Sequence, residues 1–126
     1  NDPEHASEIL EKLKSQGADG TGKRIVEIDH NGDVHPNQFW LGTKLGNVVE
    51  TPFNNIFNPN DTSKLHPLLS DLRQKHWPLD DTCGDCSYDS ICGGFRARAL
   101  NLQGELWASD PTCTLSEIER KELVKL

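Results

Sequence analysis

The sequence lacks a long apolar run, a signal peptide and any methionine. No apolar stretch approaches the roughly 20 residues that a membrane-spanning helix needs, so we expect no membrane segment. The start, Asn1-Asp2-Pro3-Glu4, has neither the basic region nor the apolar region of a signal peptide. Because no methionine begins the chain, we expect it to be a fragment or a processed product of a longer protein.

Positive charge is also scarce. Lysine and arginine total 13 against 20 aspartates and glutamates, which gives a formal net charge of −7. A surface of this sign repels phosphate groups, so we expect neither nucleic acid nor an anionic membrane as a partner. The length of 126 residues predicts one domain or a piece of a larger one, and hydrophobic residues at 34% predict a small core. A bound metal or cluster would then contribute to the free energy of folding.

Cysteine occurs four times, within a window of 31 residues and with the spacing C-x2-C-x5-C-x20-C. Four thiolates are the ligand set of one tetrahedral metal ion or one cubane iron–sulfur cluster. Glycines lie beside these cysteines, where the backbone must bend tightly around an inorganic core. We therefore interpret the chain as a metal-cluster-binding domain, and its expected ligands are Cys83, Cys86, Cys92 and Cys113.

Two other interpretations of the cysteines stay open. A four-cysteine zinc domain that mediates protein contacts is the first, although such sites usually carry two C-x2-C pairs and only Cys83 and Cys86 form one here. Two disulfides are the second, but nothing in the sequence indicates secretion. The uneven spacing favours an iron–sulfur cluster over both.

Local signals predict a small α+β fold. Asp2 as N-cap, Pro3 at the first helical position and Gly17 as C-cap predict a helix. Strands are expected over residues 24–29 and 34–40, with a hairpin turn at their junction. Pro36 indicates that the second strand ends there or lies at an edge.

The rest of the chain is expected to alternate short helices with an irregular cysteine-rich region. Thr51-Pro52 and His66-Pro67 each predict the start of a helix. A second hairpin is expected around Gln103-Gly104, with strands over residues 98–102 and 105–108. A closing helix is expected from Thr114, with Glu117 completing a capping box. Its expected buried face consists of Leu115, Ile118 and Leu123.

Two segments together resemble a known family. The first runs from Cys83-Gly-Asp-Cys86 through Cys92-Gly-Gly-Phe-Arg-Ala-Arg-Ala99 to Asp110-Pro111-Thr-Cys113. The second combines Gly-Asp-Val-His-Pro at residues 32–36 with Leu-Gly-Asn-Val at residues 45–48. Over about residues 22–118 the chain resembles the carboxyl-terminal SPASM/twitch extension of radical SAM enzymes.

The branch of that family is indicated by two further strings, His-Pro-Asn-Gln-Phe-Trp at residues 35–40 and Leu-Trp-Ala-Ser-Asp-Pro at residues 106–111. With these the chain is most similar to the haem d1 biosynthesis enzymes of the NirJ type and related sirohaem-modifying enzymes. The peptide-modifying branch shares the cysteine pattern and is an alternative.

The resemblance implies a part of a larger enzyme. In such enzymes the extension carries an auxiliary [4Fe–4S] cluster beside a catalytic barrel, whose own C-x3-C-x2-C motif serves S-adenosylmethionine cleavage. That motif is absent from this chain. We expect residues 1–21 to be a helix and linker continuing from the upstream barrel, and residues 22–126 to be the SPASM/twitch-like domain. The complete enzyme is expected in the cytoplasm, where it would modify side chains of a sirohaem-derived tetrapyrrole.

The same resemblance predicts one cluster. Full SPASM domains place a cysteine ligand of a second cluster after the hairpin proline, and here that position is Asn37, a poor iron ligand.

Residues beyond the cysteines are expected to support the cofactor. Arg96 and Arg98 follow the third cysteine and are expected to bind the cluster or to clamp substrate carboxylates. Alternation places both on one face of a strand. His35 is expected to be an ordinary edge-strand histidine, and Asp110-Pro111 to fix the turn before Cys113. Core positions or cover over the cluster are expected for Trp40, Trp77 and Trp107.

Overall fold

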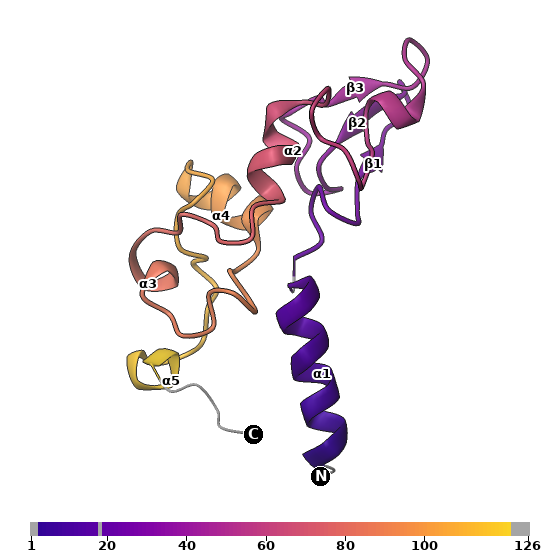
Figure 1. The fold of residues 1–126 in the computed structure, drawn as a ribbon. Helices are drawn as coiled ribbons and strands as arrows, with labels where there is room; N and C mark the ends of the chain where they lie inside the picture. Colours follow the sequence, from indigo (N-terminus) through magenta and orange to yellow (C-terminus); the bar gives the residue numbers. More distant parts are fainter. Residues whose placement is uncertain (1–2, 18, 122–126) are drawn as a thin grey trace. The chain divides into compact units, whose positions relative to one another are not determined.

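The structure, a computed structural model, describes residues 3–17 and 19–121 (Figure 1). Contacts divide the chain into two compact units. We call them the cysteine unit (Asn1–Asp19 and His76–Leu126) and the sheet unit (Gly20–Lys75). The helices and the small antiparallel sheet confirm the α+β fold class. The division into residues 1–21 and 22–126 stays a prediction.

The elements are short apart from the first helix. In the cysteine unit the helices are α1 (Pro3–Gln16), α3 (Asp81–Gly84), α4 (Arg96–Gln103) and α5 (Glu117–Lys121). In the sheet unit they are the 3-10 helix η1 (Phe53–Asn55) and α2 (Pro67–Leu72). The strands are β1 (Glu27–Ile28), β2 (Asp33–His35) and β3 (Gly46–Asn47).

The sheet is antiparallel, with β2 between β1 and β3. The turn between β1 and β2 is held by Asp29, whose Oδ1 accepts hydrogen bonds from the N–H of Asn31 (2.8 Å) and Asp33 (3.1 Å). Gly32 adopts a positive φ of 82° in this turn, which is the conformation that Asn-Gly hairpins require. The predicted hairpin is therefore confirmed, although its strands are shorter than expected. Strand β3 was not predicted.

A small apolar core lies in the sheet unit. Val34 and Leu69 are completely buried, and Leu45 and Ile56 pack with them. Helix α2 contributes Leu69 and begins as its His-Pro sequence predicts, with the N–H of Leu68 donating to Nδ1 of His66 over 3.2 Å. The core therefore joins the central strand of the sheet to α2 within one unit.

Helix α1 confirms the first predicted helix. It ends at Gly17, which adopts φ of 70° and donates its N–H to the carbonyl of Leu13 over 2.7 Å. Such a left-handed glycine is a common helix end. The predicted N-cap, Asp2, lies outside the described residues.

The hairpin predicted around Gln103-Gly104 is wrong, because residues 98–103 belong to helix α4 and residues 105–108 form no strand. Gly104 ends the helix with φ of 80°, and its N–H donates to the carbonyl of Leu100 over 2.9 Å. Arginine, alanine, leucine and glutamine favour helices and make up most of α4. The interpretation that Arg96 and Arg98 share one face of a strand is therefore wrong as well.

The closing helix begins later than predicted. Helix α5 starts at Glu117, and its capping box joins Ser116 to Glu119 instead of Thr114 to Glu117. The N–H of Glu119 donates to Oγ of Ser116 over 3.2 Å, and the N–H of Ser116 donates to Oε2 of Glu119 over 2.7 Å. The predicted buried face is wrong, because Leu115 and Ile118 are exposed, and Leu123 lies outside the described residues.

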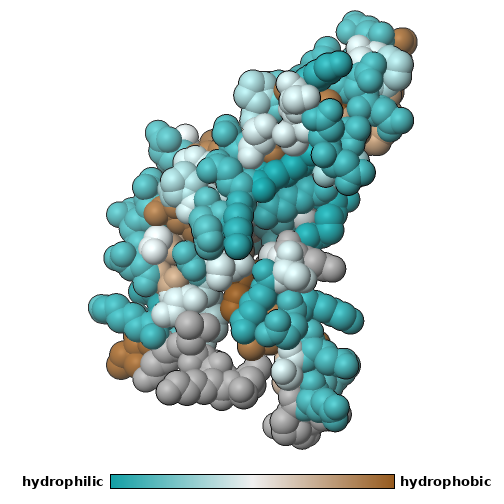
Figure 2. All heavy atoms as spheres, in the orientation of Figure 1, coloured by the Kyte–Doolittle hydropathy of each residue, from teal (hydrophilic) through white to brown (hydrophobic). Residues whose placement is uncertain are grey.

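The visible face of the chain is mostly hydrophilic, with small hydrophobic areas between polar ones (Figure 2). Charged residues make up 26% of the sequence. Among the described residues, none of the helices has the length and the apolar character that crossing a bilayer requires.

Candidate metal centre

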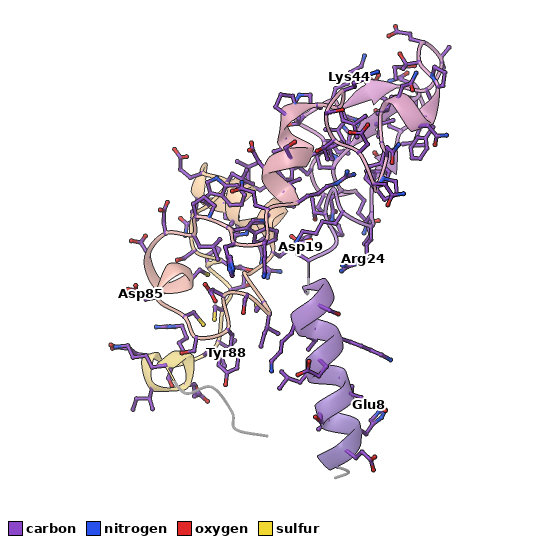
Figure 3. All side chains as sticks on the ribbon, viewed as in Figure 1. Glu8, Asp19, Arg24, Lys44, Asp85 and Tyr88 are labelled. Atoms are coloured by element: carbon purple, nitrogen blue, oxygen red, sulfur yellow. The ribbon has the colours of Figure 1, made fainter. Side chains whose placement is uncertain are left out.

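All four cysteines belong to the cysteine unit, and none of them is in a disulfide. Cys83 lies within α3, Cys86 follows this helix, and Cys92 and Cys113 lie on loops before α4 and α5. Cys83 and Cys86 are partly buried, whereas Cys92 and Cys113 are exposed. Figure 3 shows Asp85 and Tyr88 on the segment that carries Cys86.

Three of the four sulfur atoms each accept a hydrogen bond from one backbone amide. Hydrogen bonds from backbone N–H groups to cysteine sulfur stabilise the thiolate form and tune the potential of iron–sulfur clusters. The donor and acceptor pairs are Tyr88 N–H to Cys86 Sγ (3.5 Å), Gly94 N–H to Cys92 Sγ (3.3 Å) and Asp110 N–H to Cys83 Sγ (3.4 Å).

The two glycines after Cys92 allow this loop to pack closely. Gly93 and Gly94 have φ of 63° and 69°, which residues with a side chain rarely adopt. A Cβ on Gly93 would lie 2.8 Å from the ring of Trp77. A Cβ on Gly94 would lie 2.8 Å from Nη2 of Arg96 and from Cβ of Asp110. The Cys-Gly-Gly sequence therefore brings Cys92 against the segment that contains Asp110.

Asp110 connects the parts of the site. Its carboxylate accepts hydrogen bonds from the N–H of Phe95 (2.9 Å), from the N–H of Thr112 (3.1 Å) and from Arg98. Burial alone would raise the pKa of Asp110, but these hydrogen bonds outweigh it, and the pKa lies far below its usual value. The carbonyl of Asp110 accepts from the N–H of Cys113 over 3.3 Å. The prediction that Asp110-Pro111 positions Cys113 agrees with this contact.

Arg98 is partly exposed and binds Asp110. Its Nε and Nη2 form two parallel hydrogen bonds with the carboxylate of Asp110, at 2.8 Å and 2.6 Å. This paired geometry is the strong form of an arginine–carboxylate contact. The hydrogen bond to Asp110 raises the pKa of Arg98. Arg98 thus supports the segment between Cys92 and Cys113, and its Nε and Nη2 donors are used.

Arg96 is completely buried, unlike Arg98. Its Nη1 donates to the carbonyls of Leu106 and Ala108, each over 2.8 Å, while its Nε and Nη2 have no hydrogen-bond partner among the described residues. Burial lowers the pKa of Arg96, and the nearby Cys83, Asp110, Asp19 and Cys92 act in the opposite direction. A buried cation with free donors fits an anionic group held by the cysteines.

Asp19 is a supporting residue that the sequence analysis missed. Its Oδ2 accepts a hydrogen bond from the N–H of Arg96 over 3.1 Å at the start of α4. Together with Cys92, Phe95, Arg98 and other residues, it lines a cavity of about 250 Å³. No local pattern could have indicated this contact, because the two residues are 77 positions apart.

The structure does not bring the cysteines into one complete ligand set. Within residues 3–17 and 19–121, no three histidine, cysteine, aspartate or glutamate side chains are grouped closely enough to hold a metal ion. The convergence of all four sulfur atoms therefore stays a prediction. The amide donors and the unpaired Nε and Nη2 of Arg96 are the features that fit a cluster.

His35 and Asn37 belong to the sheet unit. His35 is buried on the central strand, so the prediction of an edge-strand histidine is wrong. Its Nε2 lies 2.9 Å from Oδ2 of Asp29, and its Nδ1 lies 2.9 Å from the carbonyl of Thr43. The buried Asn37 donates to Oγ1 of Thr21 over 3.0 Å, and its Oδ1 accepts from the N–H of Phe39.

The three tryptophans divide between the units. Trp40 is buried in the sheet unit, and its Nε1 donates to Oγ1 of Thr43 over 3.1 Å. Trp77 and Trp107 are paired in the cysteine unit, with ring centroids 5.9 Å apart. Because Trp77 also packs against Gly93, this pair lies beside the loop that carries Cys92.

Comparison with known proteins decides the family. The profile of SPASM, an iron–sulfur cluster-binding domain, matches residues 20–87. The chain belongs to the SPASM family. The SPASM match contains Cys83 and Cys86, while Cys92 and Cys113 lie beyond it.

Three proteins are similar to this chain over most of its length. Pre-heme d1 synthase from Dinoroseobacter shibae is 38% identical over 112 residues, covering 88% of the chain and 26% of that protein. Fe-coproporphyrin III synthase from Methanosarcina barkeri is 35% identical over 122 residues, covering 93% of the chain and 29% of that protein. AdoMet-dependent heme synthase from Nitratidesulfovibrio vulgaris is 35% identical over 95 residues, covering 75% and 23%.

The SPASM chain thus spans about a quarter of the length of these relatives. The resemblance expected from the sequence is confirmed. No solved structure matches the chain significantly.

Proposed function

We propose that Cys83, Cys86, Cys92 and Cys113 hold one [4Fe–4S] cluster. The observation that supports this most strongly is the set of three backbone amides that donate to cysteine sulfur. Such donors favour thiolates, which are the form that binds iron. Membership of an iron–sulfur cluster-binding family supports iron over zinc.

One cluster is proposed because the sheet unit offers no fifth thiolate. Asn37 stands where the second-cluster ligand is expected, and its amide group already bonds Thr21 and Phe39. The side-chain amide of Asn37 stabilises this loop through these two hydrogen bonds and needs no metal to do so. The proposed role of Asn37 is therefore structural.

A bound cluster would supply one-electron redox chemistry at this place. The chain's own residues would hold its ligands and limit the access of water. Asp110 fixes the backbone on both sides of the site through Phe95 and Cys113. Trp77 and Trp107 place apolar surface beside the loop of Cys92.

We infer that the whole protein is a radical SAM enzyme and that this chain is its carboxyl-terminal part. Its upstream barrel would bind S-adenosylmethionine, and its substrate would be a sirohaem-derived tetrapyrrole on the way to haem d1 or haem. The similarity to pre-heme d1 synthase, Fe-coproporphyrin III synthase and AdoMet-dependent heme synthase supports this substrate class. The enzyme would act in the cytoplasm. Binding of a tetrapyrrole to the whole enzyme tests this inference against the peptide-modifying branch, which would bind a peptide instead.

The cluster itself is tested by metal and sulfide analysis of these 126 residues after anaerobic preparation. We expect about four irons and four sulfides per chain, with broad visible absorbance. Stoichiometric zinc without sulfide would favour the zinc interaction domain. About eight irons per chain would contradict the single cluster.

Replacing one ligand tests the assignment residue by residue. Cys92→Ser should lose the cluster and lower the thermal stability, because a serine hydroxyl is a poor substitute for thiolate. Ser90→Ala, a neighbouring exposed position, is the matched control and should keep its iron. Unchanged iron content in Cys92→Ser would remove Cys92 from the ligand set.

A further inference from the structure

Arg96 is held rigidly at one end and has free donors at the other. Its side chain is 0% exposed, and Nη1 is fixed by the carbonyls of Leu106 and Ala108. Within residues 3–17 and 19–121, Nε and Nη2 have no hydrogen-bond partner. A buried cation with unpaired donors is costly unless an anion or acceptor lies beside it.

The free end of Arg96 lies beside the loops that carry the cysteines. A Cβ on Gly94 would lie 2.8 Å from Nη2 of Arg96, and the N–H of Gly94 donates to Cys92 Sγ over 3.3 Å. The same Cβ would lie 2.8 Å from Cβ of Asp110, whose N–H donates to Cys83 Sγ over 3.4 Å. The guanidinium group is thus next to the two amides that bond Cys92 and Cys83.

The neighbouring carboxylates are already engaged elsewhere. Asp110 binds Arg98 with both oxygens, and Oδ2 of Asp19 accepts from the backbone N–H of Arg96. Trp77 presents its ring with the centroid 5.8 Å from Cζ of Arg96, which offers a cation–π contact but no acceptor for these N–H groups. The free donors therefore fit an anion that arrives with the cofactor.

We propose that Arg96 is a positioning residue for the cluster, whose Nε–H and Nη2–H donate hydrogen bonds to its sulfur atoms and favour its reduced form. This inference rests on the proposed function, since it needs a bound cluster. A [4Fe–4S] cluster with four thiolates carries about −2 when oxidised and one further negative charge when reduced. A fixed cation stabilises the more negative state, so Arg96 raises the reduction potential. Arg98, whose Nε and Nη2 are bound to Asp110, has a smaller effect.

The test is a redox titration of the anaerobically isolated protein, followed by electron paramagnetic resonance. In Arg96→Gln we expect the equilibrium constant for one-electron reduction to fall at least tenfold, which corresponds to about 59 mV. Arg96→Lys keeps the charge but loses the planar pair of donors. Its reduction potential should lie between the potentials of Arg96→Gln and of the wild type. A loaded Arg96→Gln protein with an unchanged potential would overturn the inference.

Arg73→Gln is the matched control. Arg73 is a partly buried arginine of the sheet unit, and its Nη2 also lacks a partner, while its Nε donates to the carbonyl of Gly22 over 2.9 Å. Its replacement should lower stability without moving the potential. An equal potential shift in both variants would show a general effect of destabilisation and would overturn the role of Arg96.

A measurement on the wild type keeps the inference testable if both Arg96 variants fail to fold. With arginine alone labelled with ¹⁵N, pulsed electron paramagnetic resonance of the reduced cluster should detect a coupled arginine nitrogen. Arg98→Lys should retain this coupling. A cluster signal without any arginine coupling would overturn the inference, whereas the absence of any cluster would instead overturn the proposed function.

Discussion

At the scale of single residues, two arginines only two positions apart serve different purposes. Arg98 forms a paired contact with Asp110, while Arg96 is buried with two free donor groups. The difference follows from helix α4, because residues two apart on a helix point in different directions. Arg98 consequently braces the protein, and Arg96 is the arginine with donors left for a ligand.

His35 shows a residue-scale effect that depends on pH. Both of its ring nitrogens lie near acceptors, Asp29 and the carbonyl of Thr43, so both must carry a proton for both hydrogen bonds to form. Burial lowers the pKa of His35, but the hydrogen bonds to Asp29 and Thr43 and the charges of Asp29 and Glu27 outweigh it and raise the pKa.

We predict that the wild type loses stability relative to His35→Gln as the pH rises from about 6 to 9. Since the folded pKa of His35 lies above the unfolded value of about 6.5, its contribution is fully present below that value and is lost as the pH passes the folded pKa. Urea unfolding across this range measures it. The exposed His30→Gln should keep the wild-type slope, and parallel profiles for wild type and His35→Gln would contradict the prediction.

At the scale of elements, glycines lie at the carboxyl ends of three helices of the cysteine unit, α1, α3 and α4. Helix α4 runs from Arg96 to Gln103 and stops at Gly104. Helix α4 follows the Cys-Gly-Gly loop and contains Arg96 and Arg98 in its first turn. A substitution that destabilises the end of α4 is therefore expected to destabilise the helix that contains both arginines.

Gly104→Ala should lower the free energy of unfolding by about 1–2 kcal/mol, which is the cost of a left-handed conformation for a residue with a Cβ. The new methyl group would meet no atom within 4 Å, so backbone strain is the sole expected cause. Urea unfolding measures the change. Gly42→Ala, which is equally open but has no positive φ, should cost far less, and equal losses would contradict the explanation.

At the scale of the whole molecule, the chain has two separately packed units. The apolar core belongs to the sheet unit, whereas the cysteines and the buried arginine belong to the cysteine unit. A substitution in the apolar core should therefore destabilise the sheet unit before it affects the cysteine unit.

Leu69→Ala should destabilise the sheet unit by about 3 kcal/mol, because it removes a completely buried side chain from the core. Hydrogen exchange should speed up at the amides of β2, while the iron content stays near that of the wild type. The exposed Leu41→Ala is the control and should leave exchange in β2 unchanged. Loss of iron in a Leu69→Ala protein that still folds would contradict the independence of the units.

Features encoded by adjacent residues could be predicted. Asn31-Gly32 indicated the hairpin turn, and His66-Pro67 indicated the start of α2, because turn and cap energies depend on a few neighbouring groups. The family was indicated by the cysteine spacing and the strings around it. The helix after Cys92 could not be predicted, because a turn between two short strands and the end of a helix can both use Gly104.

The sequence by itself predicted the type of site, because four cysteines at these spacings, with glycines beside them, are typical of a thiolate ligand set. Only the tertiary structure decided which arginine is buried, which one binds Asp110, and that Asp19 supports the start of α4. Those contacts join segments distant along the chain, and their energies depend on burial and on the positions of several groups at once. A local pattern carries no information about either.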